Sequence, residues 1–170
     1  VEIDARYLHN DIVSSAFEIF EKMSSFQAAI ELLMKVIGLK FRLNRITILR
    51  TEVAEQKTKQ IFQWVSEEEY RLLVDEIHFS KNDFITLFRH NDEYGTVVIR
   101  ENDLAEYSEQ GRKNVLQGGA KTVVCAAMYC EGRYTGAIAY VTCQEKRLWS
   151  REDCKLLGEV TKIISAHYAK

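Results

Sequence analysis

The stretch from Lys121 to Cys143 constrains the fold most, because two β-rich segments meet there at a single turn. Glu131-Gly132 lies between the two segments. An acidic residue followed by glycine suits a two-residue hairpin turn, since glycine readily adopts the positive φ that such turns need. Both faces of the predicted hairpin are apolar away from the turn. Its strands are therefore expected inside a sheet that is covered on both sides.

The register that follows from this turn divides the hairpin between two faces. With Cys130 opposite Arg133, the pairing reaches back to Thr122 opposite Val141. One face is small and aliphatic, and it carries Val124, Ala126, Met128, Ala137, Ala139 and Val141. The other contains two tyrosines and a thiol, and it carries Val123, Cys125, Ala127, Tyr129, Gly136, Ile138 and Tyr140. We interpret the first as a helix-packing face and the second as the wall of a pocket.

Composition and charge exclude several classes of function. The chain has 170 residues, 46% of them hydrophobic, which is enough for one domain with a core. Its net charge is −2 and it has no long basic run, so no nucleic-acid partner is expected. No apolar run approaches the roughly 20 residues of a membrane span, and no signal peptide is present. We therefore expect a cytoplasmic protein, and a piece of a longer one, because the chain begins with Val1.

The reactive side chains do not form a known catalytic or metal-binding motif. The four cysteines are Cys125, Cys130, Cys143 and Cys154. No pair of them has the Cys-x-x-Cys spacing of a zinc site, and the four histidines are scattered along the chain. Buried free thiols in a reducing compartment are the expected state. We predict no catalytic residue and no metal site.

The N-terminal region is strongly helical. Residues 5–23 have helical periodicity, and a capping box at Ser24–Gln27 predicts a second helix from Ser25 to about residue 41. An apolar 4-3 stripe spans both, and consists of Ile12, Ala16, Ile19, Met23, Phe26, Ile30, Leu33 and Ile37. It is consistent with one continuous coiled-coil helix or with two core helices, and Ser24-Ser25 favours the break. We expect a homodimer through the terminal helices, where the stripe joins the apolar face of 156–168.

The remaining elements define an α+β fold. Strands are predicted at Arg45–Val53, Lys59–Val65 and Thr96–Arg100, in addition to the hairpin. Helices are predicted from Ser66 to about Ile77, over Glu109–Gln117, and from Ser150 onward. The fold class is thus a central antiparallel sheet of five or six strands, with the N- and C-terminal helices packed on one face and short helices and loops over the other.

Several of these segments resemble parts of the GAF domain. The similar segments are Lys121–Ala127, Glu131-Gly132, Gly136–Ala139, Leu148–Ser150, Glu152-Asp153 and Leu156-Leu157. Phe62-Gln63-Trp64, followed by an acidic patch, is similar to GAF domains attached to bacterial diguanylate cyclases. The resemblance covers roughly residues 24–169. It implies an N-terminal signalling or dimerisation helix at 1–23 and a GAF-like sensory domain at 24–170.

The resemblance also implies a function. It suggests a cytoplasmic, small-molecule-sensing regulatory domain of a bacterial signal-transduction protein, which controls a C-terminal effector such as a diguanylate cyclase. Cys143-Gln144 replaces the Asn-Lys pair of cyclic-nucleotide-binding members, and no Cys-His dipeptide offers a bilin attachment site. The ligand and any cofactor are therefore not identified. The alternatives are a cysteine-dependent redox enzyme of the methionine sulfoxide reductase type, using Cys125 or Cys130, and a dimerisation module with a degenerate pocket.

The candidate ligand pocket lies between the sheet and the 78–120 segment. Arg100 is a candidate for pairing with an anionic ligand, and His90 is a candidate polar group on the cover. The full set of predicted ligand-binding residues is Phe62, Trp64, His90, Arg100, Cys125, Tyr129, Ile138 and Tyr140.

Overall fold

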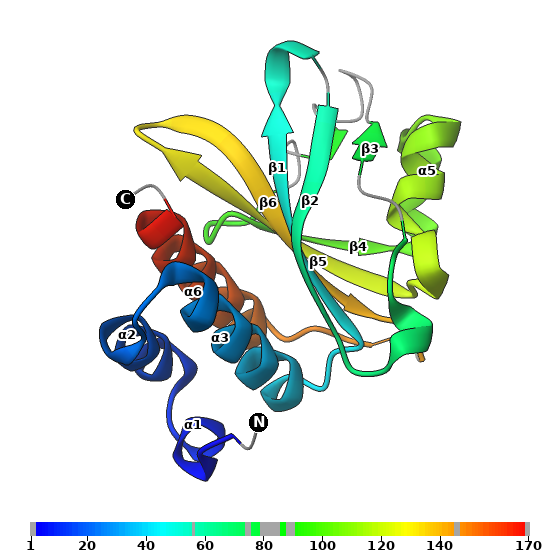
Figure 1. The fold of residues 1–170 in the computed structure, drawn as a ribbon. Coiled ribbons are helices and arrows are strands. Elements are labelled where there is room, and N and C mark those ends of the chain that lie inside the picture. The colour runs from blue at the N-terminus through cyan, green and yellow to red at the C-terminus, as the bar shows by residue number, and fades with distance from the viewer. Residues whose placement is uncertain are drawn as a thin grey trace.

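The computed structural model describes residues 3–55, 57–73, 76–78, 86–87, 91–144 and 147–168. It consists of one antiparallel sheet between two unequal covers (Figure 1). Helices α3 (Phe26–Lys40) and α6 (Arg151–Tyr168) pack on one face, and α2 (Ile12–Lys22) packs on these two helices. The short helix α5 (Glu109–Val115) lies over the opposite face. This arrangement confirms the predicted α+β class.

The sheet has six strands in the order β3-β2-β1-β6-β5-β4, and every neighbouring pair is antiparallel. The strands are β1 Arg45–Glu52, β2 Lys57–Val65, β3 Glu76–His78, β4 Thr96–Arg100, β5 Thr122–Cys130 and β6 Arg133–Thr142. The central pair is β1 and β6. The hairpin strands β5 and β6 both lie inside the sheet, with β4 and β1 as their outer neighbours, as the apolar character of the hairpin predicted.

Serine hydroxyls cap α3 and α6. The cap of α6 is Ser150, as predicted, whereas the cap of α3 is Ser25, one residue after the Ser24 of the predicted capping box. The Ser25 Oγ accepts a hydrogen bond from the Ala28 N–H at 3.1 Å, and the Ser150 Oγ accepts one from the Asp153 N–H at 3.0 Å. Each bond satisfies an N–H that has no partner inside its helix. The break between α2 and α3 at residues 23–25 therefore excludes one continuous helix over residues 5–37.

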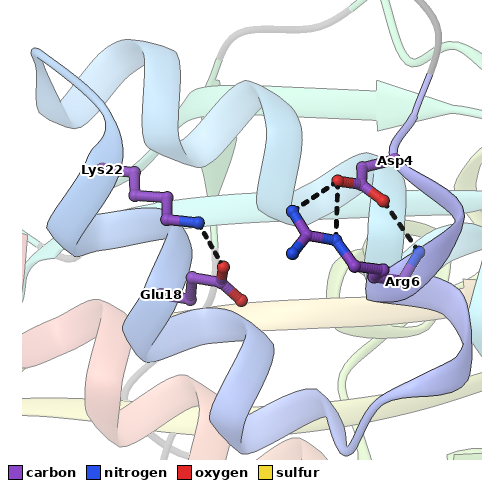
Figure 2. A network of polar contacts seen from close by, with 4 residues as sticks. All are labelled: Asp4, Arg6, Glu18 and Lys22. Atoms are coloured by element: carbon purple, nitrogen blue, oxygen red, sulfur yellow. Dashed lines mark hydrogen bonds and ion pairs between the residues drawn. The ribbon is translucent and has the colours of Figure 1, made fainter.

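The predicted helix at 5–23 is also divided, into α1 (Ala5–His9) and α2. The Asp11 carboxylate caps α2 by accepting from the Ser14 N–H at 3.1 Å, which forces extended backbone between the helices. Figure 2 shows two exposed ion pairs on this region: Asp4 with Arg6 at 2.7 Å, and Glu18 with Lys22 at 2.5 Å. Exposed pairs of this kind contribute little to stability.

The apolar stripe that suggested a dimer interface is buried in the core of the chain itself. Ile12, Ala16 and Ile19 of α2 are fully buried, and they belong to the same core as Ile30 and Leu33 of α3. α2 thus shields the outer sides of α3 and α6 from solvent. The stripe is satisfied without a second copy of the chain.

The helix predicted from Ser66 to Ile77 is wrong. A single 3-10 turn, Glu68–Tyr70, ends at an extended Arg71, and residues 76–78 form strand β3 in place of a helix. The Gln63 side chain accounts for the difference, because its amide holds the backbone of Leu72. The Leu72 N–H donates to the Gln63 Oε1 at 2.7 Å, and the Gln63 Nε2 donates to the Leu72 carbonyl at 3.1 Å. A tertiary contact thus overrides the local capping signal.

The hairpin turn is confirmed, but the predicted register holds only at its tip. Glu131 and Gly132 both have positive φ, at 52° and 78°, and Cys130 pairs with Arg133. After the next pair, a β-bulge leaves Thr135 without a paired residue in β5. The register is therefore shifted by one residue, and Thr122 pairs with Thr142 instead of Val141. Because side chains alternate along a strand, one extra residue turns the rest of β6 over. Consequently, the predicted faces are correct for β5 and exchanged for β6.

Candidate functional site

A cavity of about 70 Å³ lies between the sheet and its smaller cover. Its sheet wall comes from the central strands, and includes Leu49, Val123, Cys125, Ala137 and Ala139. Its cover comes from separate segments, and includes Leu72, Leu87, Tyr107 and Val115. This is the position in which the sequence placed a ligand pocket, between the sheet and the segment that precedes the hairpin.

Arg45 is the most unusual residue of this cavity. It begins β1, is only 2% exposed, and lines the cavity from the sheet side. Its Nη1 donates to the Tyr70 carbonyl and its Nη2 to the Gln117 carbonyl, each at 2.8 Å. The Arg45 Nε is buried without a hydrogen-bond partner among the described residues. The guanidinium is thus held in place by two cover segments while part of its bonding capacity is unused.

No carboxylate balances this charge within the described part of the chain. Arg45 is the only charged residue among the described residues that line the cavity. Burial lowers the pKa of Arg45 from its ordinary value of 12.5, and the nearby Cys143 thiol acts in the opposite direction. An arginine side chain nevertheless remains protonated in proteins. The cavity therefore contains a fixed positive charge.

Hydroxyl groups supply most of the other polarity. The Thr47 Oγ1 is buried on the wall without a hydrogen-bond partner among the described residues. Thr51 and Thr58 also line the cavity, but their hydroxyls bond to each other at 3.0 Å. Tyr134 bonds to Thr51, and burial raises the pKa of the Tyr134 phenol. Thr47 therefore resembles Arg45 in having unused bonding capacity that lies within the cavity.

Cys125 and Cys143 are free thiols at or near the cavity, and neither is activated. Cys125 lines the cavity, where burial raises the pKa of its thiol to about 12. Cys143 is buried beside Arg45, and its Sγ donates to the Gly118 carbonyl at 3.6 Å. Burial also raises the pKa of Cys143. Reactive cysteines have a lowered pKa, so neither environment favours thiolate chemistry.

Two of the predicted pocket residues belong to the opposite face of the sheet. Tyr140 and Ile138 are fully buried in the core beneath the helices. The Tyr140 hydroxyl bonds to the Thr161 Oγ1 of α6 at 2.9 Å. The bulge is the physical reason, because it turns Ala137 and Ala139 toward the cavity in their place. Of the predicted residues on the hairpin, Cys125 alone lines the cavity.

The other predicted residues lie outside the cavity. Phe62 and Trp64 of β2 face the helices, where the Trp64 ring packs against Gly38 of α3. Arg100 is exposed at the end of the edge strand β4. Tyr129 is 49% exposed at the hairpin tip, and its ring stands edge-on to Tyr134 with centroids 6.1 Å apart. The prediction for His90 lies outside the described residues.

The sequence prediction missed Arg45 and Thr47. Both alternate with Ile46 and Ile48, and that pattern marks them as occupants of the face away from the apolar core. From the sequence alone, Arg45 is only the first residue of a predicted strand. The described residues contain no group of three or more histidine, cysteine or acidic side chains that could hold a metal ion, and none of their helices could cross a membrane.

Solved structures with the same architecture carry GAF domains. The chain aligns with the phycocyanobilin-bound GAF domain from a cyanobacterial phytochrome at a TM-score of 0.71 and 11% identity, covering 99% of this chain and 96% of that one. The chain has the GAF-domain fold. The GAF domain of a phosphoenolpyruvate-protein phosphotransferase from Coxiella burnetii aligns at a TM-score of 0.71 and 8% identity, covering 98% and 95%.

The GAF fold is also similar to that of an enzyme. Free methionine-R-sulfoxide reductase from Neisseria meningitidis, in complex with its substrate, aligns at a TM-score of 0.70 and 12% identity, covering 99% of this chain and 93% of that one. No family model matches the sequence, and no curated protein matches it. These identities establish the fold alone.

Proposed function

We propose that this GAF-fold chain is a sensory regulatory domain, in which a small molecule binds in the cavity and changes the state of an attached effector. The observation that carries the proposal is the cavity itself, which is mostly apolar and contains buried polar groups with unused bonding capacity at Arg45 and Thr47. Small-molecule sites commonly combine an apolar lining with a few polar groups that fix the ligand's orientation. A GAF-fold neighbour with a bound phycocyanobilin supports the proposal.

The central strands offer a short physical route from the cavity to the terminal helices. On β6, Ala139 lines the cavity while the next residue, Tyr140, bonds to Thr161 of α6. On β5, the Tyr129 carbonyl accepts a bond from the Ser165 Oγ of α6 at 2.9 Å. A ligand that shifts these strands would therefore move the two groups that form hydrogen bonds with α6. Regulation then requires that the ligand bind one of the two arrangements more tightly.

Native mass spectrometry tests ligand binding directly. We expect the natively purified chain to carry a small molecule that is released on denaturation. Ala139→Leu fills the cavity and should abolish that mass difference, whereas the matched change Ala105→Leu at an exposed position should retain it. A chain that carries no molecule, and whose α6 amide exchange is the same in both variants, would contradict the proposal.

The similarity to a methionine sulfoxide reductase supports a second candidate, a redox enzyme that uses Cys125 or Cys130. A thiol with a pKa near 12 is thiolate in only about one molecule in 10⁵ at pH 7. We therefore favour the sensor, which requires no catalytic residue. Alkylation by iodoacetamide separates the two candidates. Reaction of Cys125 in the folded chain at a rate above that of a free thiol, together with turnover of methionine sulfoxide, would favour the enzyme.

The proposal extends to the rest of the protein. We infer a cytoplasmic bacterial signalling protein with a C-terminal effector, for which a diguanylate cyclase is the candidate from the Phe62-Gln63-Trp64 resemblance. We also infer self-association through the terminal helices. Because the α2 stripe is buried within the chain, the surface for that contact would be the exposed side of α2, where Phe17 is 57% exposed.

A further inference from the structure

We propose that the cavity binds a small monocarboxylate with a short apolar chain, and that Arg45 receives the carboxylate. This inference rests on the proposed function, in which the cavity is the ligand site. Of the five N–H groups of a guanidinium, the contacts among the described residues use two, one for the Tyr70 carbonyl and one for the Gln117 carbonyl. A carboxylate supplies the two acceptor oxygens that match the planar fork of arginine.

The energetics favour an anion over a neutral ligand. A buried charge without a counter-charge is costly, and the described residues around the cavity offer Arg45 no carboxylate. An anionic ligand removes that cost when it binds. The two carbonyl bonds also hold the guanidinium before the ligand arrives, so little side-chain freedom remains to be lost on binding.

Thr47 provides a second, independent indication. It is two residues from Arg45 on β1, and the two side chains therefore share one face of the strand. Thr47 is 2% exposed, and its hydroxyl has no hydrogen-bond partner among the described residues. A hydroxyl can donate to an oxygen of a ligand that Arg45 already holds. Two groups with unused donors thus lie next to each other on the cavity wall.

Size and lining restrict the rest of the ligand. A cavity of about 70 Å³ has room for roughly five separate waters, and because covalently bonded groups pack more closely than waters, a ligand of about seven non-hydrogen atoms is near its upper limit. Beyond Arg45 and Thr47, the sheet wall includes the aliphatic side chains of Ala137, Ala139 and Val123, and the hydroxyls of Thr51 and Thr58 are bonded to each other. Among the described lining residues there is no second cation for another carboxylate and no anion for an amino group. The best fit is therefore a short aliphatic monocarboxylate, not an amino acid or a dicarboxylate.

The test compares three molecules of nearly the same shape: isovalerate, isovaleramide and isoamylamine. Each is titrated into the isotopically labelled 170-residue chain, and the amide resonances of Thr47, Cys125 and Ala139 report occupancy of the cavity. We expect isovalerate to shift these resonances saturably. Isovaleramide should bind at least tenfold more weakly, and isoamylamine should not bind.

Substitutions then test whether Arg45 is the residue that binds the carboxylate. Arg45→Gln should reduce isovalerate affinity at least tenfold, and Thr47→Val should reduce it severalfold. Arg100→Gln is the matched control, because this arginine is exposed at the end of β4 and lies outside the described cavity lining; it should leave the affinity unchanged. If Arg45→Gln does not fold, the comparison of isovalerate with isovaleramide on the unmodified chain still decides the question.

The outcomes separate this inference from the proposed function. Equal binding of isovalerate and isovaleramide in the cavity would overturn the inference that the ligand is a carboxylate, and would leave the proposed sensory site intact. Equal loss of isovalerate binding in Arg45→Gln and Arg100→Gln would also overturn it. Absence of isovalerate binding overturns it as well; the proposed function then fails too only if native mass spectrometry finds no bound molecule.

Discussion

At the scale of single residues, Gly118 allows the backbone to lie close to the guanidinium of Arg45 in the cavity wall. Its φ is +65°, and a Cβ at this position would lie 2.3 Å from the Arg45 Nη1. That nitrogen cannot move away freely, because it is buried and bonded to the Tyr70 carbonyl. A glycine here therefore serves two needs, the left-handed backbone conformation and space for the guanidinium.

This arrangement predicts unequal effects at two adjacent glycines. Gly119→Ala should lower the free energy of unfolding by about 1–2 kcal/mol from backbone strain alone, because its φ is +77° and nothing lies within 4 Å of the added methyl. Gly118→Ala should lower it further, by roughly 1–3 kcal/mol in addition, because the methyl must displace Arg45. Urea denaturation measures both values. Equal losses would show that Arg45 is free to move.

The Cys125 thiol predicts how stability depends on alkaline pH. Its pKa is raised to about 12 from an ordinary value of 9.0, so the unfolded chain loses this proton at lower pH than the folded one. The contribution is complete below pH 9 and is lost as pH rises toward 12, with a slope of at most about 1.4 kcal/mol per pH unit. Cys125→Ala should make the measured decline shallower over that window. Parallel curves for the two proteins would contradict the prediction.

At the scale of elements, β6 depends on one close approach and one bulge. A Cβ at Gly136 would lie 2.0 Å from the Leu49 carbonyl oxygen, so β1 and β6 can pair here only with glycine. The bulge one residue earlier sends Tyr140 to the helices and Ala139 to the cavity.

We expect Gly136→Ala to destabilise the chain by about 3 kcal/mol, at the upper end for overpacking, because the methyl meets backbone that cannot rotate away. Amide exchange in β1 and β6 should accelerate. Gly132→Ala at the hairpin tip is the control; with φ at +78° and nothing within 4 Å, it should cost only about 1–2 kcal/mol. Similar costs for both would mean that β1 and β6 separate more easily than their pairing indicates.

These elements show which parts of the fold the sequence could predict. Turn chemistry and capping are local, so the hairpin turn at Glu131-Gly132 and the start of α6 at Ser150 were predictable, and the start of α3 was predicted to within one residue. A bulge changes a register by one residue without changing composition, and the faces of β6 were therefore wrong. Glycine inside a strand is a recognised sign of a bulge, and Gly136 offered that signal.

At the scale of the whole molecule, the candidate site was less predictable than the fold. Its charged side chain, Arg45, is at the start of β1. The two carbonyls that bond to it belong to residues 25 and 72 positions later in the sequence. No local pattern contains that contact. Arg100, the arginine that the sequence suggested, occupies the sheet edge instead. The general location of the cavity was predictable, because the order of the elements indicates a sheet with a cover on each face. The identity of its polar groups was not, because they are brought together by contacts between residues far apart in the sequence.

The last prediction concerns whether α2 belongs to the core or to an interface. Ile19 is fully buried beneath α3 and α6, whereas Phe17 on the same helix is 57% exposed. Ile19→Glu should therefore lower the free energy of unfolding by about 3–5 kcal/mol, because it buries an unpaired charge. Phe17→Glu should change it by less than about 0.5 kcal/mol and should weaken self-association.

Denaturation and light scattering at micromolar concentration measure the two effects separately. If Ile19→Glu gave a stable, folded monomer, α2 would be a detachable interface helix instead of a layer of the core. If the unmodified chain were monomeric under these conditions, self-association through the terminal helices would be wrong, while the buried position of Ile19 would still predict its loss of stability. The paired substitutions thus test the two roles of one helix independently, since their side chains lie on different sides of it.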